Sequence, residues 1–296
     1  MAVIAAIAYF SREREPFYNG KPLSRWIHLN ATSPRSSHAE QAEVVAIRQI
    51  GTNALPFLLK WMRYDSSRGG VRNTLRTILG KLPNSIVPDA LQEWIDTSVE
   101  EDRSVNAAVA FEPLAELATN AVPELVDMIK DPVFPRASQR AIAALGGIGR
   151  PALPILLARL TNTNALHRVE VANLFSIFKE LGTNDASVVP ILVRCLEDPD
   201  SDLRFAAALA LGSRAVDERA QAPLVVPALA NYLNFAADEE SQDMAMRALG
   251  AYGDQARASV PVLLRMTEYP VETIRKAATN TLLVIAPEAL TNAPPQ

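Results

Sequence analysis

The sequence has little material for covalent cross-links or metal binding. Its 296 residues include one cysteine, Cys195, and three histidines, His28, His38 and His167, which lie far apart in the chain. A single cysteine excludes a disulfide framework, and this set of side chains is too small for a zinc site of the Cys/His kind. We therefore expect no metal, no other cofactor and no catalytic residues, with the histidines in loops or facing solvent.

Other residues that could carry chemistry have simpler structural explanations. Cys195 lies in the apolar run ILVRCLED, so we expect it to pack in the core, where free cysteine is usually found. The glycine-rich run at residues 146–149 has no preceding strand, which a phosphate-binding loop needs, so we expect a loop between two helices. Trp26, Trp61 and Trp94 occur at helical apolar spacing and are predicted to fill the core.

The chain also lacks a strong excess of charge of either sign. There are 29 Lys and Arg against 33 Asp and Glu, a net charge of −4, which argues against a protein whose main partner is nucleic acid. Locally the charge alternates, with net values of +5 over residues 60–81, −9 over 85–127, +4 over 128–182 and −7 over 183–244. These blocks either form patches for a partner with its own charge pattern or are simply solvated outer faces.

The two ends of the chain differ from its middle. Residues 1–10 read MAVIAAIAYF, an apolar run too short to span a bilayer alone, since a spanning helix needs about 20 residues. Three interpretations stay open: part of a membrane anchor, a short helix packed on the body, or a frayed end. Residues 11–36 are predicted to be a linker around one short helix over 23–29, and residues 291–296 a tail. Localisation stays open between membrane-anchored and cytoplasmic, with membrane contact only through residues 1–10.

An internal repeat fills the rest of the chain, residues 37–290. An apolar residue followed by proline recurs about every 34 residues. The pairs are Leu55-Pro56, Val87-Pro88, Val122-Pro123, Leu153-Pro154, Val189-Pro190, Val226-Pro227 and Val260-Pro261. An apolar run follows most of them, and Ala/Leu-rich runs before several of them end at Gly80, Gly146, Gly212 and Gly250.

This pattern predicts two helices in each repeat. Proline is tolerated in a first helical turn, and glycine suits the left-handed residue that closes the preceding helix. One such helix pair cannot bury its apolar face alone, so successive pairs must stack. Since no run shows sustained alternation of apolar and polar residues, we expect no sheet.

The repeats resemble HEAT repeats, in particular the short bacterial kind found in phycobilisome-lyase-like proteins. The best match is VVPILVRCLEDPDSDLRFAAALALG, residues 188–212, with its Asp198-Pro199-Asp200 turn and Arg204 early in the second helix. In the preceding repeat Asn162 and Arg168 stand in place of the Asp and Arg. The resemblance implies an all-α fold, a right-handed α-α superhelical solenoid of about seven HEAT-type helix pairs. Tetratricopeptide repeats share the period but not the residue pattern.

The resemblance also implies how such a chain works. HEAT arrays commonly bind partners along a concave face lined by the second helices, so we expect a non-enzymatic scaffold for a protein partner, with pairs of the Asp198/Arg204 type joining adjacent repeats. By position, the predicted contact residues are Arg72, Arg76, Arg140, Arg168, Arg247 and Lys276. Two alternatives remain: a bilin-lyase-like or other HEAT-based enzyme subunit, and a HEAT-like DNA glycosylase, which the acidic blocks disfavour.

Overall fold

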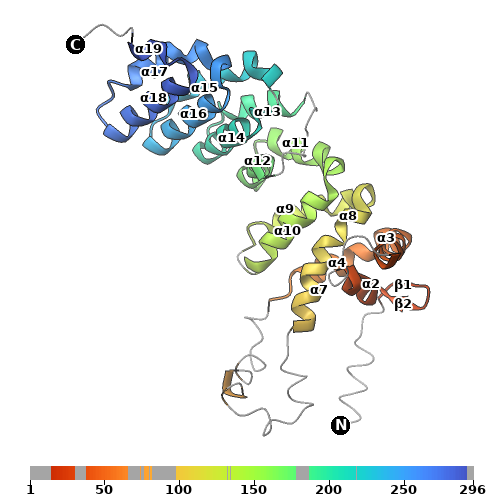
Figure 1. The fold of residues 1–296 in the computed structure, drawn as a ribbon. Coiled ribbons are helices and arrows are strands. Elements are labelled where there is room, and N and C mark those ends of the chain that lie inside the picture. The colour runs from red at the N-terminus through yellow and green to blue at the C-terminus, as the bar shows by residue number, and fades with distance from the viewer. Residues whose placement is uncertain are drawn as a thin grey trace. The chain divides into compact units, whose positions relative to one another are not determined.

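The computed structural model describes residues 15–30, 38–65, 98–131, 135–177, 187–217 and 219–291, with single short stretches at 74, 77–79, 81 and 133. The chain divides into two compact units, Met1–Ala152 and Leu153–Gln296. Apart from one short hairpin, the regular structure in the described residues is helical (Figure 1). The predicted all-α solenoid is confirmed, and the hand of its superhelix stays a prediction.

In the second unit, the described residues form four stacked helix pairs. The first helices are α11 (Leu153–Thr161), α13 (Val188–Cys195), α15 (Ala222–Phe235) and α17 (Val260–Met266). The second helices are α12 (Arg168–Ile177), α14 (Ser201–Arg214), α16 (Glu239–Ala251) and α18 (Glu272–Ile285), followed by the short α19 (Glu288–Thr291). Within each layer, every helix packs on its counterpart in the next pair, which buries a continuous apolar seam (Figure 1).

Small residues bring the second helices of this unit close together. Ala207 and Ala208 of α14 are fully buried. A Cβ atom added to Gly212 would lie 3.0 Å from the Cα of Ala248 on α16, so no side chain fits there without movement. The glycine is therefore needed for close packing of α14 on α16.

The left-handed glycines that follow the helices lie later in the chain than the sequence predicted. Gly146, Gly212 and Gly250 lie inside α10, α14 and α16, and the left-handed residues of positive φ include Gly149 and Gly253. The prediction that the earlier glycines end the helices is therefore wrong, as is that of a loop over 146–149, which falls mostly within α10. The reason lies in contacts with distant parts of the chain. Gly147 of α10, for example, has no side chain and so lets the backbone of Glu112 approach α10.

Proline marks helix starts with one exception. Pro56, Pro123, Pro154 and Pro261 each occupy the second residue of their helices, as the repeat predicted. Pro227 instead lies inside α15, which begins at Ala222 with another proline in its first turn. The predicted start at Val87-Pro88 lies outside the described residues.

The described residues of the first unit form a short hairpin and three further helix pairs. The hairpin is β1 (Phe17–Tyr18) with β2 (Lys21–Pro22), and it corrects the expectation of no sheet. The pairs are formed by α2 (Leu23–Asn30) with α3 (His38–Ile50), α4 (Leu55–Met62) with α7 (Ser98–Val109), and α9 (Val122–Met128) with α10 (Pro135–Ile148). Connecting elements are η1 (Gly51–Ala54), α8 (Phe111–Leu114), η3 (Ala115–Ala121) and η4 (Arg150–Ala152).

The hairpin holds the start of α2, the helix predicted over 23–29. The turn between the strands has positive φ at Asn19 (46°) and Gly20 (73°), as a tight two-residue hairpin requires. The indole Nε1 of Trp26 donates to the Tyr18 carbonyl at 3.1 Å, and the Glu15 carboxylate accepts from the Ser24 amide at 2.9 Å. Residues 15–30 are thus packed onto the helical body, because α2 contacts both α3 and α7.

Helices α4 and α7 form one pair although residues 63–97 separate them in the sequence. The two ends of that stretch meet at α10. Arg136 lies 3.8 Å from a carboxylate oxygen of Asp65 and 3.3 Å from one of Glu101. Arg136 of α10 therefore contacts both the residues that follow α4 and the first turn of α7.

None of the described helices is by itself long and apolar enough to cross a membrane. One bent pair, Arg136–Ile148 with Arg150–Thr161, meets the length and composition criteria only when its two parts are taken together.

The close approach of α14 and α16 is tested by one substitution made at two glycines. Gly250→Ala places its Cβ 3.8 Å from the Thr281 methyl group, so helix propensity should raise the free energy of unfolding by up to about 1 kcal/mol. Gly212→Ala meets backbone at 3.0 Å and should lower it by about 1 kcal/mol or more. Urea unfolding followed by circular dichroism measures both, and equal effects would contradict the packing argument.

Candidate functional site

The structure divides the six predicted contact residues into three groups. Arg72 and Arg76 lie outside the described residues. Arg140 and Arg168 are partly buried and make hydrogen bonds within the fold. Arg247 and Lys276 are 73% and 72% exposed. Only the last two therefore combine a described position with a freely accessible side chain.

Arg140 closes the end of helix α4. Its Nη1 donates to the carbonyl oxygens of Met62 at 2.9 Å and Tyr64 at 2.5 Å, where the helix leaves carbonyls without intrahelical partners. Burial lowers the pKa of Arg140, and the neighbouring Arg136 lowers it further. The residue thus joins α10 to α4 inside the first unit.

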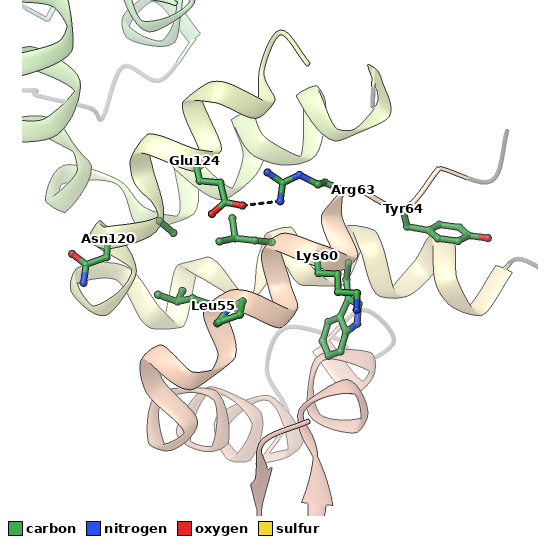
Figure 2. Close-up of a pocket in the computed structure, with 10 residues that line it drawn as sticks. Leu55, Lys60, Arg63, Tyr64, Asn120 and Glu124 are labelled. Carbon is green, nitrogen blue, oxygen red and sulfur yellow. Dashed lines mark hydrogen bonds and ion pairs between the residues drawn. The ribbon is translucent and has the colours of Figure 1, made fainter. Parts of the chain in front are cut away.

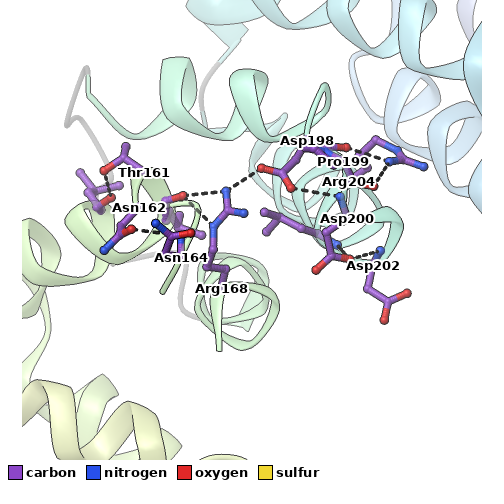
Figure 3. Close-up of polar contacts among 12 residues, drawn as sticks. Thr161, Asn162, Asn164, Arg168, Asp198, Pro199, Asp200, Asp202 and Arg204 are labelled. Atoms are coloured by element: carbon purple, nitrogen blue, oxygen red, sulfur yellow. Dashed lines mark hydrogen bonds and ion pairs between the residues drawn. The ribbon is translucent and has the colours of Figure 1, made fainter. Parts of the chain in front are cut away.

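Arg168 joins two successive helix pairs in the second unit (Figure 3). Its Nη2 lies 2.6 Å from Oδ2 of Asp198, and both side chains are about one tenth exposed, at 11% and 10%. Its Nε and Nη2 also donate to the Leu160 carbonyl at 3.1 and 2.9 Å. An Asp/Arg pair therefore does join adjacent repeats, but its cation is Arg168, and the prediction that Arg204 is the partner of Asp198 is wrong.

The pKa of Asp198 reflects this contact. Burial raises the pKa of the carboxyl group, but hydrogen bonds from Arg168 and from the Asp200 backbone amide outweigh burial. The pKa therefore lies below its ordinary value of 3.8. Since the carboxylate is stabilised in the folded protein, its contribution to stability is present at neutral pH and is lost as the pH falls through the lowered pKa.

The residues around Asp198 complete the turn into α14. Oδ1 of Asp200 accepts from the amides of Asp202 at 2.9 Å and Leu203 at 3.3 Å, which caps the helix. Nη1 of Arg204 donates to the carbonyls of Asp198 at 2.7 Å and Pro199 at 3.0 Å (Figure 3). Both residues therefore act in building the turn.

The same turn contact recurs in the next two pairs. Arg275 donates to the Tyr269 carbonyl at 2.8 Å, and Gln242 donates to the Ala236 carbonyl at 3.1 Å. In each case, as with Arg204, the donor follows its acceptor by six residues. A polar residue early in the second helix thus stabilises the turn before it.

Charged residues farther along the second helices make a different kind of contact. Arg247 pairs with Asp243 at 2.6 Å on α16, and Lys276 pairs with Glu272 at 2.6 Å on α18. Each pair spans one turn of its own helix and lies on the surface. Such exposed pairs contribute little to stability, so these charges are available to a partner.

The first unit has an open groove of about 690 Å³ between α4 and the η3–α9 segment (Figure 2). Leu55, Leu59 and Ala121 contribute apolar surface, and the groove also contains Trp61 and Tyr64. Sequence reasoning did not single out this combination, because η3 and α9 are far from α4 in the sequence and η3 meets α4 only in the folded unit.

An ion pair crosses this groove. Nη1 of Arg63 lies 2.7 Å from Oε1 of Glu124, with the two side chains 32% and 46% exposed (Figure 2). Trp61 packs beside Phe57, with ring centroids 6.0 Å apart, and is only partly buried, so its predicted place in the core is half correct. Trp26 is buried as predicted, and Trp94 lies outside the described residues.

Among the described residues, the remaining candidates for catalysis or metal binding have a structural explanation. Cys195 is 4% exposed, which confirms its predicted place in the core, and burial raises its pKa to about 11. His167 has a φ of 60° and lies 3.7 Å from Glu170. The side chains of His28 and His38 lie outside the described set. No group of metal-ligating side chains gathers within the part of the chain that the structure describes.

Comparison with known proteins agrees with the repeat architecture. Residues 188–213 match the family model of the HEAT repeat. These residues form α13 and nearly all of α14, the segment in which Asp198, Asp200 and Arg204 build the turn. The family model describes a structural repeat rather than a catalytic activity. No curated protein matches the chain.

Several solved structures resemble the chain distantly. An engineered protein aligns over 91% of this chain and 80% of its own length, with 19% identity and a TM-score of 0.43. Kap121p, solved bound to Pho4p, aligns over 98% of this chain and 36% of its own, with 13% identity and a TM-score of 0.39. A designed armadillo repeat protein in complex with the peptide (KR)4 aligns over 89% and 99%, with 16% identity and a TM-score of 0.32. The similarity to the HEAT repeat is carried by the family-model match at residues 188–213.

The Arg168–Asp198 contact predicts a large loss of stability when it is broken. Arg168→Met should lower the free energy of unfolding by about 2 to 4 kcal/mol at neutral pH, because it leaves a nearly buried carboxylate without its cation. Arg247→Met is the matched control and should cost less than about 0.5 kcal/mol. The deficit of Arg168→Met should shrink as the pH falls below about 3.8. Equal deficits in both variants would contradict the assignment.

Burial of Cys195 predicts an unreactive thiol. Because the pKa is raised to about 11 and the side chain is 4% exposed, iodoacetamide should not label the folded protein at pH values near neutrality. Unfolding in urea should make labelling complete. Mass spectrometry of the intact protein measures the added group, and rapid labelling of the folded chain would show that the thiol is accessible.

Proposed function

We propose that the protein is a non-enzymatic scaffold that binds a protein partner along the layer of second helices. The observation that carries the proposal is the placement of Arg247 and Lys276. Both are about three quarters exposed, both lie on second helices, and neither is needed to connect one helix to another. An interface built on them would not compete with the contacts that hold the fold.

The charged residues of the second helices make two different kinds of contact, and this difference supports the proposal. Near the starts of second helices, Arg168, Arg204 and Arg275 are bound to carbonyl or carboxylate oxygens of the turns. Arg247 lies in the middle of α16 and Lys276 directly follows Arg275 on α18, and each forms an ion pair with a residue of its own helix. The helices α16 and α18 pack side by side, so these two side chains belong to one surface. Repeat proteins bind partners through surfaces of this kind.

The groove of the first unit offers a second contact region for the partner. It brings together Trp61, Arg63 and Tyr64, three residue types that are enriched at the energetic centres of protein interfaces. Its apolar lining gives a peptide segment area to bury, and the Arg63–Glu124 pair gives polar groups at the edge. For the bilin-lyase-like and DNA-glycosylase alternatives the described residues offer no such observation, and we propose neither.

The experiment is affinity capture from the native cell followed by quantitative mass spectrometry. The wild-type chain should recover a reproducible protein partner. Arg247→Glu with Lys276→Glu should reduce that recovery at least about tenfold, because like charges placed opposite a complementary partner cost several kcal/mol. Circular dichroism should show an unchanged fold.

The matched control reverses two exposed arginines outside this surface, Arg194 on the first helix α13 and Arg219 in the connection before α15. This variant has the same net charge as the test variant and should keep the partner. Loss of the partner in both variants, or in neither, would overturn the proposed surface.

A further inference from the structure

A cavity of about 420 Å³ lies among the first helices of the second unit, between α13 and α15. Val193 and Leu196 line it on the side of α13, and the aromatic residues Tyr232 and Phe235 line it on the side of α15. Phe235 is 75% exposed. A ligand in the cavity would cover this ring, and burial of apolar surface favours binding.

The two aromatic residues occupy repeat positions that recur in the groove of the first unit. Tyr232 and Phe235 are the fifth and eighth residues after Pro227, the repeat proline of α15. Trp61 and Tyr64 have the same spacing from the repeat proline of α4. Aromatic residues at the same two positions of a first helix thus line a groove in each unit.

The hydroxyl group of Tyr232 is left without a partner in this cavity. The side chain is only 4% exposed, and its hydroxyl has no hydrogen-bond partner within 3.5 Å among the described residues. Burial raises the pKa of Tyr232, and the nearby Ser241 lowers it in part, but the Ser241 hydroxyl donates its own proton to Asp238 at 2.8 Å. A buried donor without an acceptor is costly, so a ligand that supplies an acceptor is favoured.

Carboxylates gather around the polar side of the cavity. Glu197 lines the cavity, is exposed, and has no ion-pair partner among the residues that the structure describes. Asp198 also lines it. The turns that follow α13 and α15 and the helix starts after them carry further acidic residues: Asp200, Asp202, Asp238, Glu239 and Glu240.

The cations nearby are already engaged or face elsewhere. Arg204, which lines the cavity, donates to two carbonyls of the turn, and Arg168 pairs with Asp198. Arg265 donates to an amide oxygen of α15 at 2.8 Å, and Arg194 lines a separate cavity on the α11 side of α13. Seven carboxylates stand against these four cations, so the surroundings of the cavity are net negative.

We propose that this cavity binds a basic segment of the protein partner, with a Lys or Arg side chain over the Phe235 ring and its charge beside Glu197. The aliphatic part of that side chain covers Leu196, and a backbone carbonyl of the segment accepts from the Tyr232 hydroxyl. A neutral or acidic segment would cover the same apolar surface but would leave the carboxylates uncompensated, which is why a basic segment fits better.

This inference rests on the proposed function in one respect, that the partner is a protein. It adds the charge of the bound segment and a site on the first helices, separate from Arg247 and Lys276 on the second helices.

The test uses the full chain and a fluorescein-labelled peptide composed of Lys, Arg and Leu, with a second peptide in which Glu replaces every Lys and Arg. Fluorescence anisotropy should show binding of the basic peptide that weakens as salt is raised, and no binding of the acidic one. Phe235→Ser combined with Glu197→Gln should weaken binding at least about tenfold, because these changes remove the ring beneath the cation and its counter-charge.

Tyr232→Phe tests the unpartnered hydroxyl. It should weaken peptide binding about fivefold without lowering the free energy of unfolding, because the hydroxyl gains its hydrogen bond only from the ligand. Urea unfolding followed by circular dichroism measures the stability. A loss of stability with unchanged peptide binding would overturn the assignment of this hydroxyl to the site.

The matched control is Leu166→Ser combined with Glu268→Gln. Leu166 is 73% exposed, and Glu268 is exposed at the repeat position on α17 that Glu197 has on α13. This variant should bind the basic peptide as the wild type does. Equal weakening in the test and control variants, or equal binding of the basic and acidic peptides, would overturn the proposal.

A further variant separates this site from the surface of the second helices. Arg247→Glu with Lys276→Glu should bind the basic peptide at least as tightly as the wild type, although it loses the native partner. Loss of peptide binding in this variant would overturn the placement of the site between α13 and α15. Circular dichroism checks that each variant folds.

Discussion

No helix pair in this protein can cover its own apolar face, and the whole structure depends on that constraint. In the second unit, α12, α14 and α16 each pack on the next second helix along the chain, so stability comes from contacts between neighbours. The approach of α14 to α16 at Gly212 and Ala248 shows how narrow the fit is. A side chain as small as a methyl group already meets backbone there.

The polar contacts follow from the same stacking. Between the two helices of a pair the chain must turn, and each turn leaves carbonyl groups that need donors. Arg204, Gln242 and Arg275 supply them from the start of the following helix, and Arg168 reaches one pair farther to Asp198. Cations in these positions are therefore part of the framework, whereas Arg247 and Lys276, placed beyond the turn, are left for other contacts.

The sequence alone was sufficient for features that depend on local chemistry. The proline positions located most first helices, the apolar spacing located α2, and the surroundings of Cys195 placed it in the core. The sequence alone did not predict features that depend on contacts between residues far apart in the chain. Nothing near Gly212 indicates that Ala248 will lie against it, and nothing near Arg140 indicates that it will meet the carbonyls of Met62 and Tyr64.

The pairing of α4 with α7 has a consequence for how this chain tolerates change in length. Arg136 and Arg140 of α10 bind the end of α4, and Arg136 also binds Glu101 of α7, so one helix holds both members of this pair. Closing a longer connection between two fixed points costs little additional entropy, about 0.6 kcal/mol for each doubling of its length. Sequence added between α4 and α7 should therefore leave the register of the neighbouring repeats unchanged.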